Sequence, residues 1–195
     1  MSHPGAGSDP EPFREAIDSM HAATVRSEIE IGAIRPPQRL APYSYAIGAE
    51  VRSPETDIVA EDSDGETFGR LILLYDPNGH EAWNGLMRLV AYVQSDVDEE
   101  LAADPLLPEV AWSWLTDSLA ERGGQVTALG GTVTATSSVR FGDIAGPPRA
   151  HQLELRASWT ATDPDLSGHV ESFAAVLAMA AGLPPVGVAQ LGRSS

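Results

Sequence analysis

The side chains best suited to chemistry in this sequence are few and widely spaced. Histidine occurs at positions 3, 21, 80, 151 and 169, and no two have the i, i+4 spacing of zinc ligands on a helix. His151 shares the inward face of a predicted strand, where a nearby carboxylate would make it an acid–base group. Together with Glu154, Arg140 and Arg156 it forms an alternative small-molecule site. His151 and Glu154 face opposite sides of an ideal strand, so this site needs a bulge that turns one of them. A histidine at such a position is more commonly a structural residue of the core or its rim, with its ring nitrogens hydrogen-bonded.

Searches for other catalytic patterns exclude several classes of enzyme. The chain has no cysteine and no lysine, which excludes thiolate catalysis, iron–sulfur clusters and the lysine-dependent phosphate loop. No serine has the glycine spacing of a nucleophile elbow. If the acidic run 61–66 belonged to an EF-hand calcium loop, Ala60 and Leu71 would occupy the first and last ligand positions, and neither side chain can bind calcium. This run therefore predicts a solvated turn. We therefore assign no catalytic residue, cofactor or metal.

A different kind of site is suggested by the segment from Asp104 to Leu115. Trp112 and Trp114 are two residues apart, so on a helix they point about 200° from each other. Trp114 belongs to the apolar stripe, which leaves Trp112 at its edge or outside. With Pro105, Leu106 and Pro108 it forms a candidate interaction surface, because an exposed Trp is a good interface anchor. The alternative is that the prolyl loop 105–108 or another helix covers Trp112.

Charge limits the partners that the chain can take. The 195 residues carry 28 acidic and 12 basic side chains, all of the latter Arg, for a net charge of −16. Such a field repels nucleic acid and anionic membranes, and no cluster of Arg offsets it. The absence of cysteine and of a signal peptide predicts a soluble, cytoplasmic protein.

The elements that must position these residues follow from periodicity. Helices are predicted at about 11–30, from residue 80 to Asp104, at 108–123 and at 167–181. Strands are predicted at 43–52, 57–61, 67–75, 125–141 and 149–161, with a turn at 76–79 and a bulge at Gly130-Gly131. The order α-βββ-αα-ββ-α predicts an α+β fold in which helices pack mainly on one face of an antiparallel sheet of about five strands. We expect one domain at 11–192, between tails at 1–10 and 193–195.

The last predicted helix has an uncharged back, formed by Ala175, Ala178 and Ala180. Such a helix packs closely on both sides. Its own domain or a second subunit could cover the back, and a homodimer is therefore one expectation.

Three phrases resemble a known family. They are ADPLLPEVAWSWL at 103–115, LELRASWT at 153–160 and GLPP at 182–185, and they look like the actinobacterial family called "domain of unknown function 3000". The likeness spans about residues 12–192 and implies a cytosolic protein, but no activity. The order of elements is also similar to that of small acidic secretion-chaperone-like proteins, which are often dimers.

Two functions stay open on the sequence. The leading hypothesis is a non-enzymatic protein-binding or adaptor module, chaperone-like and a possible homodimer, that binds neither nucleic acid nor membrane. The alternative is an enzyme with a small-molecule site near the hairpin at 125–161.

Overall fold

The computed structural model of the chain describes residues 9–52, 67–144 and 149–187. Among these residues the helices are α1 (Glu11–His21), α2 (Glu99–Ala102), α3 (Leu107–Arg122) and α4 (Ser167–Ala180), with short 3-10 turns η1 (Glu81–Trp83) and η2 (Gly142–Ile144). The strands are β1 (Ile29–Ile34), β2 (Tyr43–Val51), β3 (Phe68–His80), β4 (Gly85–Val97), β5 (Val126–Ser138) and β6 (Ala150–Ala161).

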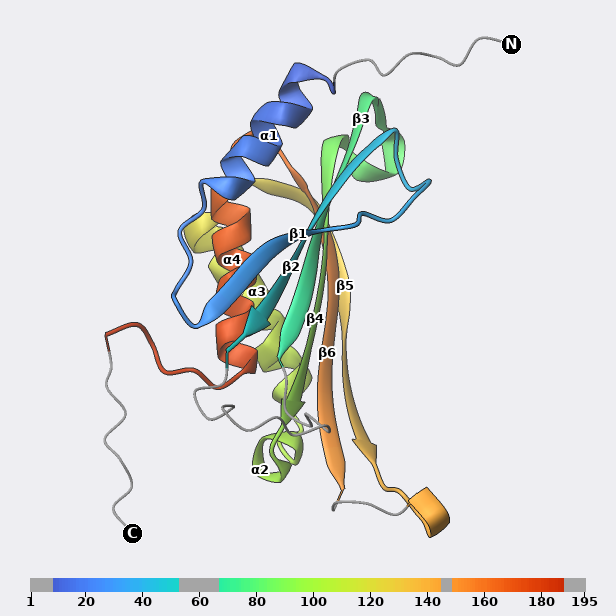
Figure 1. Cartoon of the computed structure of the whole chain (residues 1–195), viewed down its shortest axis with the longest axis vertical. Helices are drawn as coiled ribbons and strands as arrows, with labels where there is room; N and C mark the ends of the chain where they lie inside the picture. Colours follow the sequence, from blue (N-terminus) through green and yellow to red (C-terminus); the bar gives the residue numbers. More distant parts are fainter. Residues whose placement is uncertain (1–8, 53–66, 145–148, 188–195) are drawn as a thin grey trace.

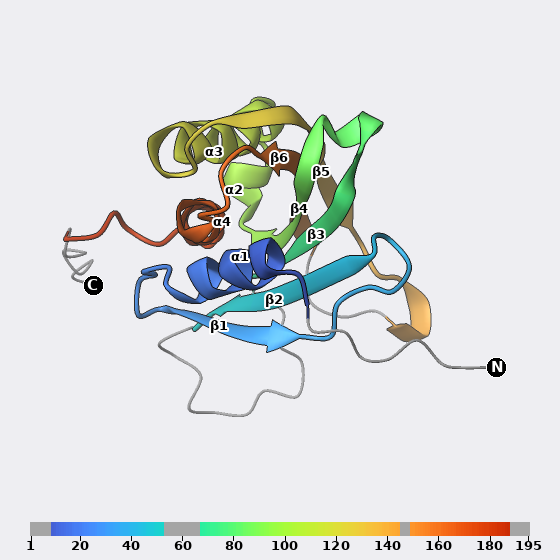
Figure 2. The same ribbon diagram turned by 90° about the horizontal axis from the view of Figure 1, so that it is seen from above.

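The described strands form one antiparallel sheet in the order β1-β2-β3-β4-β6-β5. Helices α1, α3 and α4 lie together on one face of it (Figure 1), and the view from above shows the same arrangement (Figure 2). The predicted α+β class is confirmed, with six strands where the sequence indicated about five. The other face carries exposed Thr132, Thr134 and Thr136 on β5.

The first helix is shorter than predicted. It ends at His21, and residues 29–34 form β1 instead of a helical continuation. The apolar residues of 25–34 fit a helix stripe as well as an alternating strand, and pairing with β2 decides between them. Ile29 faces Val51 and is buried, and the amide of Arg52 donates to the carbonyl oxygen of Glu28 at 2.8 Å.

The helix predicted from residue 80 was wrong. Residues 85–97 are strand β4, between β3 and β6, and its alternate residues Met87, Leu89, Ala91 and Val93 are all buried. The other face of β4 also carries the apolar residues Leu86 and Val90, so the strand as a whole contains a helical spacing. The turn predicted at 76–79 lies inside β3, whose register shifts between Tyr75 and His80. The chain reverses at η1 instead.

The remaining elements match their predictions closely. Helices α3 and α4 begin and end within one residue of the predicted bounds, and β5 and β6 form the predicted hairpin. The bulge of β5 falls between Thr127 and Gly130, directly before the predicted glycine pair, with Ala128 at a φ of 51°. The strand predicted at 57–61 lies outside the described residues.

The core lies between the sheet and the helices. Trp159 of β6, Phe173 of α4 and Leu89 of β4 are fully buried there. Helix α4 lies against α3, and a Cβ at Gly168 would collide with the carbonyl oxygen of Arg122. Glycine therefore permits the close crossing that sets the spacing of these two helices.

Candidate functional site

A groove of about 510 Å³ runs along α3 and α4 on the side away from the sheet. Residues 24–26 before β1 and residues 183–186 after α4 complete its walls. Its apolar lining consists of Val25, Trp114, Ala174, Ala175, Ala178, Met179, Leu183, Pro184, Pro185 and Val186. This volume lies within the range of sites that bind small molecules or short peptide segments.

Helical periodicity explains why these side chains gather in the groove. On α3, Trp114, Asp117, Ser118 and Glu121 follow the i, i+3, i+4, i+7 spacing of one helix face. Two residues of the uncharged back of α4, Ala175 and Ala178, line this groove. Ala178 is buried and Ala175 is half-buried, so the chain itself covers most of the uncharged surface on which the dimer expectation depended.

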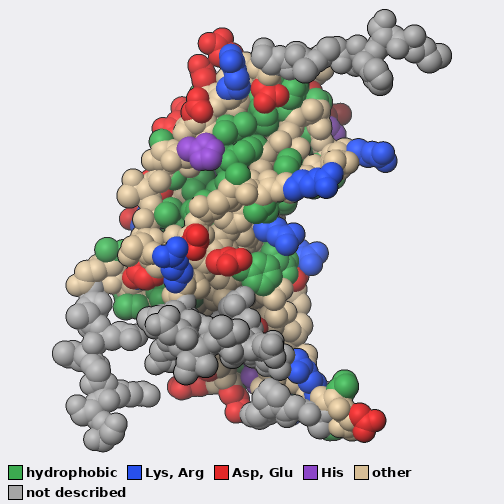
Figure 3. Space-filling model, in the orientation of Figure 1, with side chains coloured by type: hydrophobic (Ala, Val, Ile, Leu, Met, Phe, Trp, Pro, Cys, Tyr) green, Lys and Arg blue, Asp and Glu red, His purple; other side chains and the backbone are tan. Residues whose placement is uncertain are grey.

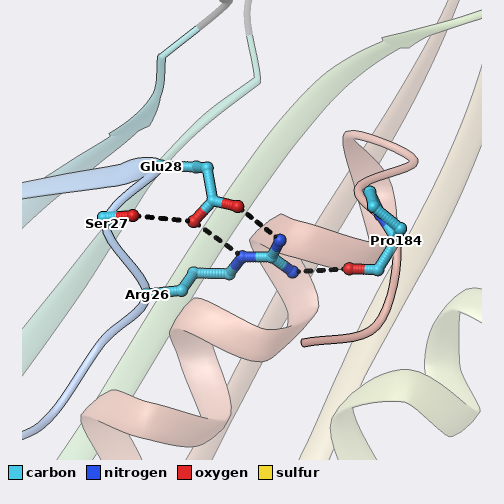
Figure 4. Close-up of polar contacts among 4 residues, drawn as sticks. All are labelled: Arg26, Ser27, Glu28 and Pro184. Atoms are coloured by element: carbon cyan, nitrogen blue, oxygen red, sulfur yellow. Dashed lines mark hydrogen bonds and ion pairs between the residues drawn. The ribbon is translucent and has the colours of Figure 1, made fainter. Parts of the chain in front are cut away.

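Hydrogen bonds from Arg26 to Glu28 and Pro184 connect the chain just before β1 to the segment that follows α4, and we call this set of contacts the Arg26 clamp (Figure 4). The guanidinium of Arg26 donates to the carbonyl oxygen of Pro184 at 2.9 Å. It also donates through Nε and Nη2 to both carboxylate oxygens of Glu28, at 3.2 and 2.7 Å. Ser27 Oγ donates to the same carboxylate at 3.3 Å. The donor pair from Arg26 lowers the pKa of Glu28 to about 2, so the ion pair persists across the physiological pH range.

The charged rim of the groove has an acidic excess. Glu121 pairs with Arg122 at 2.9 Å, so Asp117 and Glu171 are the other charged side chains of α3 and α4 that line the groove. Glu171 Oε1 accepts the backbone N–H of Thr24 at 3.0 Å, so its partner there is an uncharged amide. Arg26 is neutralised by Glu28. An apolar floor beneath carboxylates suits a ligand that is apolar on one side and cationic on another.

Only some of the residues predicted to form an interaction surface are exposed in the structure. Leu106 is 60% exposed and Pro105 is exposed, whereas Pro108 is half-buried. Trp112 is half-buried because its ring lies over Gly131 of β5, where an added Cβ would stand 2.8 Å from Cζ3. Neither the prolyl loop nor a second helix accounts for this contact, which is with the sheet.

Of the four residues of the alternative small-molecule site, Glu154 and Arg156 are in contact, whereas His151 lies on the other side of the strand. His151 lies on the helix-facing side of β6, in a shallow hollow beside Glu99 and Ala102. Glu154 lies on the other side, where it accepts from Tyr92 Oη at 2.9 Å and from Arg156 Nε at 2.8 Å. Arg140 lies beyond the end of β5 and is exposed.

Sequence analysis missed most of the groove. Arg26 and Glu28 fall inside the first predicted helix, and Pro184 appears only as part of the family phrase at 182–185. The one signal available was the uncharged back of α4.

Among the described residues, no group of three His, Cys, Asp or Glu side chains is arranged to hold a metal ion. No described helix is both long and apolar enough to span a bilayer. The acidic run 61–66 lies outside the described residues.

Comparison with known proteins gives one match. No curated protein and no solved structure matches the chain. The model of the family described as "Protein of unknown function (DUF3000)" matches residues 9–189, a range that includes every wall of the groove. The family predicted from the three phrases is thereby confirmed, while its actinobacterial origin stays a prediction. This chain belongs to the DUF3000 family of proteins of unknown function.

Proposed function

We propose that this protein is a non-enzymatic adaptor, chaperone-like in its mode of action, that binds a basic amphipathic segment of a partner protein. The α3–α4 groove is the binding site. The observation that carries the proposal is the combination of an apolar floor, formed around Trp114 and Met179, with unneutralised carboxylates at Asp117 and Glu171.

The apolar part of the ligand follows from the lining. Trp114, Ala175 and Met179 are each half-buried, so a partner side chain placed on them removes the remaining apolar surface from water. A methionine on the floor adapts to ligands of different shape, which suits the recognition of a segment rather than of one small molecule.

The basic part of the ligand follows from charge. The net charge of −16 attracts cationic partners over a distance of several ångströms, and the two rim carboxylates fix where the cationic side chains bind. The absence of cysteine from the sequence agrees with a cytoplasmic setting for this interaction.

The groove is poorly equipped for catalysis. Thr24 and Ser118 are the hydroxyl side chains of its lining. Behind them, Ser172 Oγ donates to the carbonyl oxygens of Ser118 and Gly168, at 2.9 and 2.7 Å. The described residues that line the groove include no histidine. A nucleophile within hydrogen-bond reach of a base, which acyl transfer requires, is therefore not formed by its described residues.

A peptide selection tests the proposal. A phage-displayed random peptide library is selected on the full chain, and binders are counter-selected on an Asp117→Arg/Glu171→Arg variant. We expect enriched peptides with apolar residues and several Lys or Arg, whose affinity falls by about 100-fold in the variant. The affinity should also weaken as salt rises.

A matched variant separates the local effect from the change in net charge. Glu100→Arg/Glu109→Arg makes the same charge change at exposed positions outside the groove. It should keep nearly all the affinity. Peptides that bind both variants equally would overturn the groove as the site, and an acidic consensus would overturn the charge argument.

A further inference from the structure

Strand β5 ends the sheet with an open edge. It is 13 residues long, and among the described residues its only partner strand is β6. Every second residue of such a strand directs its backbone N–H and C=O away from its single neighbour, toward water. An edge of this length is a template on which another strand can add.

The edge of β5 lacks the features that usually prevent such pairing. From Val126 to Val139 there is no charged residue and no proline. The bulge is confined to the first part of the strand, and the register with β6 is regular from Gly130 to Ser138. The opposite edge is protected, because β1 has only six residues and carries the Glu30–Arg52 ion pair at 2.8 Å.

Exposed apolar side chains continue the β5 edge. Val139 is 45% exposed, Phe141 78% and Ile144 73%. These residues stand at the end of the β5–β6 hairpin, which extends past the helices at the lower end of the molecule in Figure 1. Three large apolar side chains in six residues are unusual for a solvated loop and are typical of a contact surface.

We propose that two copies of this chain pair through β5, in antiparallel orientation, to form one continuous sheet across a two-fold axis. Identical edges meet in this way without any change of fold, because a two-fold interface uses the same residues on both sides. A pairing centred on Thr134 places Val139 of one copy opposite Leu129 of the other. Leu129 is half-buried, so the apolar tip gains an apolar neighbour.

The charge distribution is compatible with a second copy at this edge. Two chains of net charge −16 repel each other, and Figure 3 shows acidic side chains along α1. The uncharged stretch from Val126 to Val139 lets two copies approach without a direct contact between like charges. This inference is independent of the groove and of its ligand.

The mass of the chain in solution tests the proposal. Light scattering coupled to size exclusion should give twice the chain mass of 20.6 kDa over a concentration series. Lysines on an edge strand block pairing. The Thr134→Lys/Thr136→Lys variant, changed at two exposed side chains, should raise the dimer dissociation constant by at least about 100-fold. Gln38→Lys/Asn78→Lys adds the same charge at exposed positions far from β5 in sequence and should remain a dimer.

A cross-linking experiment identifies which β5 residues face each other in the dimer. It also gives a result that does not depend on the folding of the lysine variants. Because the chain has no cysteine, Thr132→Cys, Thr134→Cys and Thr136→Cys each introduce a single thiol. Facing Cα atoms in antiparallel strands lie about 4.5–5.5 Å apart, within reach of a disulfide. Mild oxidation should give a covalent dimer from one or two of these variants and none from Asn78→Cys. A wild-type monomer at every concentration, or equal cross-linking at position 78, would overturn the proposal.

Discussion

The indole N–H of Trp159 donates to Nδ1 of His169 at 3.1 Å, and both side chains are buried between β6 and α4. Since Nδ1 accepts this hydrogen bond, the imidazole is neutral and carries its proton on Nε2. Burial lowers the pKa of His169 to about 4, and the nearby Asp165 and Asp163 oppose that shift only in part. The pair joins a central strand to the helix that forms one wall of the groove.

This pair predicts a loss of stability in mild acid. The unfolded chain binds a proton on His169 near pH 6.5, whereas the folded chain does so only near pH 4. Stability from this group is therefore complete above pH 6.5 and declines as the pH falls toward 4. The free energy of unfolding should drop by about 3 kcal/mol across this window. Urea unfolding at a series of pH values measures it.

The control for this prediction is His169→Gln, which keeps a hydrogen-bond acceptor but does not titrate. Changes in the other charged groups affect both proteins equally, so the difference between the two curves isolates His169. That difference should shrink steadily from pH 7 to pH 4. Parallel curves would show that His169 does not lose its proton on folding.

The contact of Trp112 with Gly131 predicts a structural cost when either is changed. Trp112→Ala should lower the free energy of unfolding by about 2 kcal/mol, roughly half the loss for a fully buried Trp. Gly131→Ala should cost about 1–3 kcal/mol, because the new Cβ would collide with the carbonyl oxygen of Arg156 and would also stand 2.8 Å from the Trp112 ring. Thermal unfolding of both variants measures the effect. An unchanged melting temperature for Trp112→Ala would place the ring in solvent and restore it as an interface anchor.

The class of the fold could be predicted because most of its elements have clear ends. Helix α3 is bounded by Pro108 and Gly123, and α4 by Pro164 and Gly182, so their limits were available locally. Strand β4 could not be predicted in this way, because its apolar residues fit a helical stripe, namely Leu86, Val90, Val93 and Val97. The alternation of buried and less buried side chains that marks a strand exists only when β3 and β6 pair with it on either side. Tertiary pairing decided the secondary structure there.

The groove could be predicted only in outline. The uncharged back of α4 indicated a packed or partner-covered helix, and the groove is where that surface remains partly open. The clamp joins Arg26 to Pro184, which lies 158 positions away in sequence. No local pattern signals a contact of this range, and the error at residues 22–30 hid Arg26 and Glu28 inside a helix.

The Arg26 clamp predicts order in the segment after α4. Arg26→Met keeps much of the apolar stem but removes the hydrogen bonds to Pro184 and Glu28. Amide hydrogen exchange at Leu183, Val186 and Gly187 should then become faster, with little change in the sheet. Arg26→Lys should show an intermediate effect, because a lysine cannot make the forked contact with the carboxylate. Unchanged exchange in both variants would mean that the clamp does not hold this wall of the groove.

The protonation of Glu28 provides an independent check of the same clamp. Its carboxylate stabilises the fold at every pH above the ordinary glutamate pKa of 4.5, and this contribution is lost as the pH falls toward about 2. NMR titration of the Glu28 side chain measures the value directly. In Arg26→Met the pKa should return toward 4.5, and a pKa already near 4.5 in the wild type would contradict the paired geometry.

The most direct test of binding in the α3–α4 groove is an NMR titration of the isotope-labelled chain with a basic amphipathic peptide obtained by selection. The indole N–H signal of Trp114, together with amide signals of Asp117, Ala175 and Met179, should shift in a saturable manner. The signals of Tyr92 and Thr134, on the face of the sheet away from the helices, should not move. If the shifts instead cluster on that face or on the β5–β6 hairpin, the groove is not the binding site and the account is wrong.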